Sequence, residues 1–94
     1  MARIVWSPVA REDFQAITSF IKADSPGYAK TFGWHIQQRV EQLQNFPRSG
    51  RIVPEDETGR YRELIVGNYR VVYRTEEDTV TIMTVIHGAR LLHF

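Results

Sequence analysis

The sequence contains no cysteine and no apolar run long enough for a signal peptide or a membrane span. The lack of cysteine excludes disulfides and thiolate metal sites. It fits a reducing compartment, and we expect a cytoplasmic protein. The 94 residues are enough for one domain with its own core, so residues 1–94 are predicted to form a single domain.

Lysine is scarce as well, since ten of the twelve basic residues are arginine and only two are lysine. Arginine is the better residue for forked contacts with phosphate or carboxylate groups. A bias in genomic base composition explains the same ratio, so the ratio alone identifies no ligand. The net charge of +1 and the hydrophobic content of 43% are ordinary for a soluble globular chain.

A strong hairpin signal lies between residues 60 and 74. Two runs rich in valine, isoleucine and tyrosine are separated by Gly67-Asn68, which predicts a type II′ turn and with it the register of the two strands. The predicted cross-strand pairs are Val66 with Tyr69, Leu64 with Val71, Arg62 with Tyr73, Ile65 with Arg70, Glu63 with Val72 and Tyr61 with Arg74. One face is nearly all apolar and should be buried. The face that carries Glu63 and Arg70 is expected to be open to water or to a partner.

Two Ser-Pro pairs, at residues 7–8 and 25–26, each predict the start of a helix, because serine caps the first turn and proline suits its first position. The first helix should end near Asp24 and the second at Pro47. The apolar stripes are Ala10, Phe14, Ile17 and Ile21 in the first helix and Ala29, Phe32, Ile36, Val40 and Leu43 in the second. Gly33 lies inside the second stripe, where we expect a close approach of the first helix.

The remaining segments are a short opening strand at residues 3–6, a surface loop at residues 47–60 and a third strand of the meander at residues 79–87. This third strand is apolar on both faces, with Val80, Ile82 and Ile86 on one face and Met83 and Val85 on the other. It should therefore be interior to the sheet and covered on both sides. The helix pair is one cover, and the other is either the tail, residues 88–94, or another molecule. The predicted fold class is α+β: an N-terminal strand, an αα-hairpin and a three-stranded antiparallel meander.

Three segments follow the two Ser-Pro helix starts: Phe46-Pro-Arg-Ser-Gly-Arg51, then Arg62-Glu-Leu-Ile-Val-Gly-Asn-Tyr-Arg-Val-Val-Tyr73, then Val85-Ile-His-Gly-Ala-Arg90. In this order they resemble the ParE/RelE toxin superfamily over nearly the whole chain, most closely its ParE-like, plasmid-stabilisation branch. The resemblance implies the toxin half of a type II toxin–antitoxin pair, with the helical hairpin packed on one face of an antiparallel sheet. It also implies a small cognate antitoxin, ParD-like or similar, whose C-terminal segment folds onto the toxin to form a hetero-oligomer.

The superfamily divides by target: RelE-type members cleave mRNA in the ribosome, and ParE-type members poison DNA gyrase. Metal-free RNA cleavage requires a base, cationic groups and an acid. By resemblance, Arg70 and Arg90 match two basic positions of the nuclease site, and Arg62 matches a third when the hairpin loop is allowed one gap. Leu64 falls at a further basic position, however, and the usual terminal tyrosine is missing, so His87 or His93 would have to replace it.

Each candidate also has a structural interpretation. Arg70 and Arg74 share a face with Glu63, which fits a neutralised ion network as well as a phosphate clamp. His87 fits a structural role near a strand end, and Arg90 fits an ion pair with Glu63 or with an antitoxin carboxylate. His35 is expected to face solvent, whereas Trp6 and Trp34 are expected to be core or packing residues.

The incomplete nuclease set favours a toxin that binds gyrase without hydrolysing it, and a ribosome-dependent mRNA endoribonuclease is the alternative. No catalytic residue is assigned to the first; the second would use Arg62, Arg70, His87 and Arg90. No cofactor, metal site or membrane contact is expected. The residues expected to contact the target or the antitoxin are Arg60, Arg62, Glu63, Arg70, Arg74, His87 and Arg90.

Overall fold

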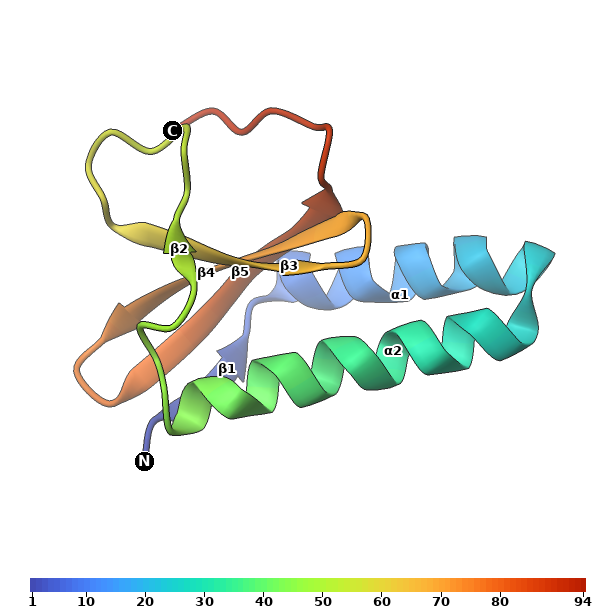
Figure 1. Ribbon diagram of the computed structural model, residues 1–94, viewed down its shortest axis with the longest axis horizontal. Helices are drawn as coiled ribbons and strands as arrows, with labels where there is room; N and C mark the ends of the chain where they lie inside the picture. Colours follow the sequence, from blue (N-terminus) through green and yellow to red (C-terminus); the bar gives the residue numbers. More distant parts are fainter.

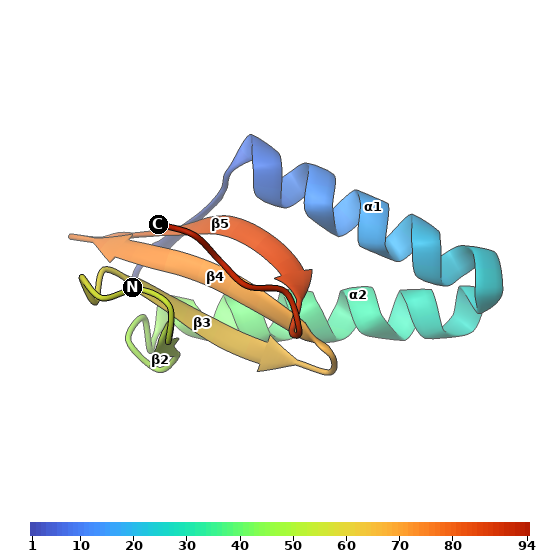
Figure 2. The same cartoon turned by 90° about the horizontal axis from the view of Figure 1, so that it is seen from above.

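The computed structural model describes residues 1–94 as two helices packed on one face of a five-stranded sheet (Figure 1). The elements are β1 (Arg3–Trp6), α1 (Pro8–Asp24), α2 (Pro26–Glu41), a 3-10 turn (Gln42–Gln44), β2 (Arg51–Ile52), β3 (Tyr61–Val66), β4 (Tyr69–Glu76) and β5 (Thr79–His87). Figure 2 shows α1 and α2 running side by side and extending beyond the sheet at their connected end.

The strands lie in the order β1-β5-β4-β3-β2, so the predicted meander of β3, β4 and β5 forms the middle of the sheet. All six predicted pairs of the hairpin are present. Gly67 has a φ of 59° whereas Asn68 has no positive φ, as a type II′ turn requires. The opening strand β1 pairs in parallel with β5 and forms one edge of the sheet.

The prediction of a surface loop at residues 47–60 is wrong in two respects. First, β2 adds a fifth strand beside β3, with Arg51 opposite Glu63. Second, Val53 and Asp56 are buried. A strand of two residues is too short to produce a periodic signal, and the burial depends on contacts with segments distant in the sequence.

Both helix starts are confirmed. Ser7 and Ser25 each accept a hydrogen bond from the backbone N–H three residues further on, at 3.0 and 3.3 Å. α1 ends at Asp24 as predicted, but α2 ends at Glu41, well before Pro47, because the chain tightens there into the 3-10 turn. Neither helix has the length and hydropathy that crossing a membrane requires.

The core lies between the helix pair and the sheet. It consists of Ala10, Phe32, Ile36, Val40, Leu43, Leu64, Val66, Val71, Tyr73, Val80, Ile82 and Val85. The five residues of the stripe predicted for α2 are all buried, whereas α1 buries only Ala10 and leaves the rest of its stripe partly exposed. α2 therefore supplies more of the core than α1.

A β-bulge at Met83 changes which side chains of β5 face the core. Ile82 and Thr84 pair with adjacent residues of β4, so Met83 between them has no partner. The extra residue shifts the alternation by one. Val85 consequently joins the core and Ile86 faces the opposite side, which reverses the predicted assignment of both.

α1 holds this bulge in place. The carboxylate of Asp13 accepts hydrogen bonds from the hydroxyl of Thr84 and from the backbone N–H of Val85, the latter at 3.0 Å. The hydroxyl of Ser7 donates to the carbonyl of Met83 at 2.9 Å. These polar contacts tie the start of α1 to the last strand and fix where the bulge occurs.

Gly33 provides a test of the helix packing. A Cβ at this position would lie 3.5 Å from the ring of Phe14, which is ordinary van der Waals contact, so alanine fits. We expect Gly33→Ala to raise the free energy of unfolding by about 1 kcal/mol, because glycine is a poor helix former. Urea denaturation measures the change. A loss of stability would show that the helices approach more closely than alanine allows.

Candidate functional site

Arg70 lies at the centre of an ion-pair network on the sheet face opposite the helices. Its Nε donates to Oε1 of Glu63 at 2.6 Å, and its Nη1 and Nη2 donate to the two carboxylate oxygens of Glu55 at 2.7 Å each. Nη1 also donates to the backbone carbonyl of Arg90 at 2.9 Å. Only 5% of the Arg70 side chain is exposed, so its hydrogen-bonding capacity is nearly all used within the protein.

Glu63 is the buried partner in this network. Its side chain is 0% exposed, and its Oε2 accepts from Nε of Arg51 at 2.6 Å. The loop after β2 and the C-terminal tail lie above the sheet, on the side away from the helices (Figure 1). The expectation of an open second face is therefore wrong where Glu63 and Arg70 lie, because other parts of the chain cover them.

The tail, residues 88–94, is held by Glu55 and Arg70. The backbone N–H of Leu92 donates to Oε2 of Glu55 at 3.0 Å, and the rings of Tyr61 and Phe94 lie 5.0 Å apart. The second cover of the sheet is thus the tail of the chain itself. Hydrogen bonds from Arg70, and then from Leu92, lower the pKa of Glu55 from 4.5 to about 2.

This lowered pKa predicts how tail docking depends on pH. The stabilisation that the ionised Glu55 gives to the docked tail is fully present above pH 4.5, the ordinary pKa of this carboxyl. It is lost as the pH falls through about 2. We expect hydrogen-exchange protection of the Leu92 amide to decrease over that window. Glu55→Gln should remove the pH dependence, and a tail that stays protected in wild type at the acid end would contradict the assignment.

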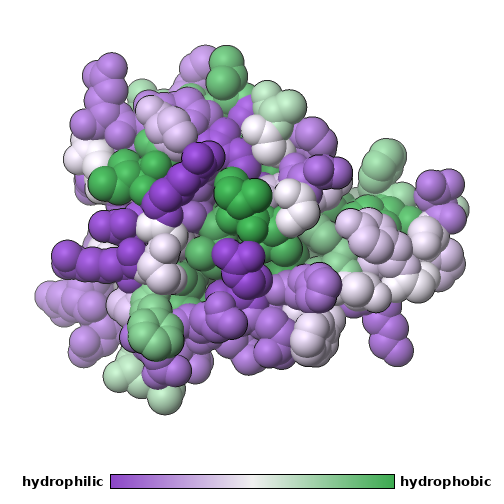
Figure 3. Space-filling model, in the orientation of Figure 1, coloured by the Kyte–Doolittle hydropathy of each residue, from purple (hydrophilic) through white to green (hydrophobic).

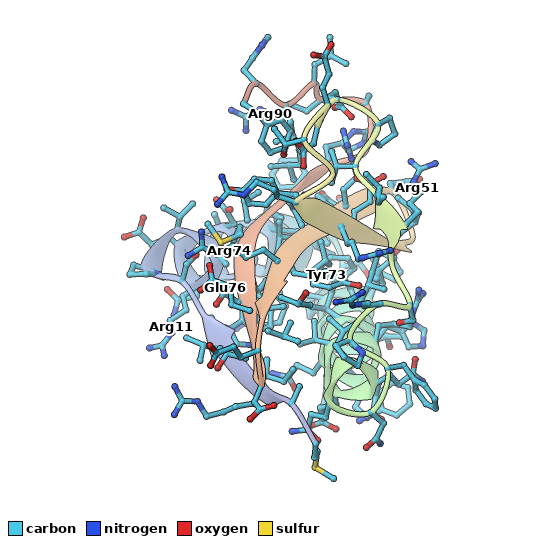
Figure 4. The ribbon with its side chains drawn as sticks, turned by 90° about the vertical axis from the view of Figure 1, so that its left-hand side faces the viewer. Arg11, Arg51, Tyr73, Arg74, Glu76 and Arg90 are labelled. Atoms are coloured by element: carbon cyan, nitrogen blue, oxygen red, sulfur yellow. The ribbon has the colours of Figure 1, made fainter.

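Four other arginines line a separate hollow, which we call the arginine cleft. It is lined by Arg48, Arg60, Arg62 and Arg74 together with Gly59, Thr75 and Glu76, has a volume of about 300 Å³ and contains no hydrophobic residue. Nη1 of Arg62 donates to the carbonyls of Arg48 and Gly50, at 3.3 and 2.8 Å. Nε of Arg74 lies 3.7 Å from Oε1 of Glu76, and Figure 4 shows these two side chains next to each other.

His87 and Arg90 occupy a third place, at the end of β5 and on the tail. Both are exposed. Nδ1 of His87 accepts from the backbone N–H of Ala89 at 3.1 Å, and its ring packs edge-on against Tyr69 at 5.6 Å. Figure 4 shows Arg90 well apart from Arg74.

The seven predicted contact residues thus fall in three places. Arg60, Arg62 and Arg74 line the arginine cleft, Glu63 and Arg70 are buried in the ion-pair network, and His87 and Arg90 lie at the end of β5 and on the tail. Sequence reasoning missed three residues: Arg48 in the cleft, Glu55 as the carboxylate that engages Arg70, and Arg51 as the second partner of Glu63. No group of three histidine, aspartate or glutamate side chains is placed to hold a metal ion.

Comparison with known proteins decides the family. The family model described as the ParE toxin of the type II toxin–antitoxin system parDE matches residues 4–92. This chain belongs to the ParE toxin family. The ParE-family chain is also 32% identical, over 92 residues, to Toxin RelE2 of Caulobacter vibrioides, an alignment that covers 97% of this chain and 100% of that protein.

Solved structures agree on the fold of this ParE-family toxin. The chromosomal ParDE toxin–antitoxin system from P. aeruginosa contains a chain with a TM-score of 0.78 and 21% identity, covering 93% of this chain and 96% of that one. The RelBE2 toxin–antitoxin complex from Mycobacterium tuberculosis contains a chain with a TM-score of 0.59 and 24% identity, covering 92% of this chain and 96% of that one. The predicted α+β class and the superfamily resemblance are both confirmed.

Proposed function

We propose that this toxin arrests growth by binding DNA gyrase and trapping its cleaved DNA complex, without hydrolysing its target. The observation that carries the proposal is the engagement of Arg70 by Glu63 and Glu55. Metal-free RNA cleavage needs cations free to stabilise charge that develops on the phosphate. Leu64, at a further expected basic position, is buried in the core and supplies no proton chemistry. These features support a mechanism of binding.

The test is to incubate the purified toxin with gyrase, ATP and plasmid. We expect supercoiling to fall and cleaved DNA to accumulate after the protein is denatured and digested. Toxin and plasmid without gyrase should give intact DNA, which separates poisoning from intrinsic nuclease activity. If supercoiling is unaffected and no cleaved DNA accumulates, the gyrase proposal fails.

We propose further that a cognate, ParD-like antitoxin neutralises the toxin by docking along the helix pair. Large hydrophobic side chains there remain exposed, including Phe20 at 76% and Trp34 at 58%. Figure 3 shows that hydrophobic residues also gather near the middle of one face, bordered by hydrophilic ones. An apolar, acidic helix from the antitoxin would bury such side chains and pair its carboxylates with arginines. Co-expression with the neighbouring reading frame should yield a hetero-oligomer. A toxin that purifies from this co-expression as a soluble monomer without a bound partner would contradict this proposal.

Ribosome-dependent mRNA cleavage is the second candidate, favoured by the 32% identity to a protein named Toxin RelE2. Primer extension on translated mRNA discriminates between the two. New ends in the ribosomal A site that vanish with Arg90→Ala would favour cleavage, because that side chain is exposed and its removal leaves the core intact. If no new mRNA ends appear, gyrase is favoured as the target.

A further inference from the structure

We propose that the arginine cleft is a binding site for the phosphodiester backbone of a nucleic acid. The first support is uncompensated charge. Arg48, Arg60 and Arg62 take part in none of the ion pairs of the structure. The one carboxylate of the cleft, Glu76, is 67% exposed and lies 3.7 Å from Arg74, a long contact in a solvated position. Four guanidinium groups therefore face one loosely held carboxylate.

The second support is that the cleft is held in shape before any ligand arrives. Arg62 is fastened by the two backbone carbonyls that it contacts, which leaves its Nε and Nη2 without a partner. The buried carboxylate of Asp56 orders the turn that carries Arg60, since it accepts from the backbone N–H groups of Thr58 and Tyr61 at 2.9 and 2.8 Å. A preorganised cation loses less freedom when it binds.

The third support is the unsatisfied state of Arg74. Its Nε is shielded from water and has no hydrogen-bond partner. A buried donor without an acceptor is destabilising, because it has lost its hydrogen bonds to water and gained none in the protein. The nearest carboxylate is too distant for a hydrogen bond, so this side chain gains from a small rearrangement that brings it an anionic oxygen.

The lining identifies the chemical class of the ligand. A peptide that docks by apolar side chains needs hydrophobic partners, and no hydrophobic residue lines the cleft. Guanidinium groups match phosphate oxygens in forked geometry, and several arginines close together suit a ligand with regularly spaced negative charges. A nucleic acid strand has that spacing. The inference holds for either target, since the gyrase complex offers DNA and the ribosome offers RNA.

The test uses the purified toxin and fluorescence anisotropy with a labelled DNA duplex and a labelled single-stranded RNA. We compare the double variant Arg48→Ala/Arg60→Ala with Arg3→Ala/Arg11→Ala, which removes the same charge from exposed positions that do not line the cleft. The cleft variant should bind at least about tenfold more weakly than the control variant, and its plot of log K against log salt should be shallower by about 2, one for each lost phosphate contact. Both replaced side chains are exposed, so circular dichroism should report an unchanged fold.

Three results would overturn the proposal. The cleft variant and the control variant could bind both probes equally. Polyglutamate could compete as well as the unlabelled strand at equal charge, which would assign the cleft to an acidic peptide. Inorganic pyrophosphate could compete as well as the strand per phosphate, which would assign it to a free phosphate compound. If the wild-type toxin binds the DNA duplex and the single-stranded RNA with different affinities, the tighter probe identifies whether the bound backbone is DNA or RNA. The gyrase assay is a separate experiment. The failure of either proposal, gyrase poisoning or nucleic-acid binding by the arginine cleft, therefore does not decide the other.

Discussion

Replacing Arg70 with alanine is expected to lower the free energy of unfolding by about 3 to 5 kcal/mol. The substitution removes the cation between Glu63, which has no solvent access, and Glu55, which also anchors the tail. Glu63 would keep only the exposed Arg51 as a partner, and two carboxylates would lie near each other without the charge that separates them. Removing one member of a buried ion pair costs more than the pair itself contributes, because the remaining charge stays desolvated.

Urea denaturation followed by circular dichroism measures this effect. Arg60→Ala is the matched control, since it removes the same type of side chain from an exposed position and should change stability by less than about 0.5 kcal/mol. Any loss of toxicity in Arg70→Ala would then reflect a loss of structure. If the variant instead kept wild-type stability and lost only activity, Arg70 would be a functional group and the binding mechanism would need revision.

Gly50→Ala is expected to be the second most damaging single change, with a cost of about 3 kcal/mol. An added Cβ would lie 2.6 Å from the hydroxyl of Tyr73 and 2.7 Å from the backbone carbonyl of Glu63. Tyr73 is fully buried and its hydroxyl accepts from the backbone N–H of Gly50 at 2.9 Å, so neither group has space to withdraw. The methyl group would both overpack the site and break that hydrogen bond.

Thermal and urea unfolding of Gly50→Ala should be compared with Gly27→Ala. Gly27 has no atom within 4 Å of an added Cβ and lies in the first turn of α2, so alanine there should be neutral or slightly stabilising. Equal stability of the two variants would mean that β2 and its preceding turn move freely away from β4, contrary to the buried contact with Tyr73.

Local chemistry explains which parts of the fold were predictable. The two serine caps and the Gly67-Asn68 turn determine helix starts and hairpin register through bonds between near neighbours in the sequence. The bulge at Met83 was not predictable, because it depends on hydrogen bonds from α1, more than half the chain away. The short strand β2 exists because β3 lies beside it, and its own two residues carry no pattern.

The sequence identifies candidate residue types but not their arrangement. It shows that ten of the twelve basic residues are arginine, but it does not say which carboxylate each will meet. Glu55 lies in a stretch that reads as an acidic loop, and only the folded chain brings it to Arg70. Arg48 joins the cleft because the turn before β2 returns toward β3, a path set by the burial of Val53 and by Tyr73 holding Gly50.

The parallel pairing of β1 with β5 has a consequence for biosynthesis. The first strand made by the ribosome finds its neighbour only when the last one has emerged, so the helical hairpin exists for some time without a completed sheet. Such a long-distance pairing is intrinsically slow. Each newly translated molecule therefore passes through an interval in which the sheet, and every surface that depends on it, is incomplete.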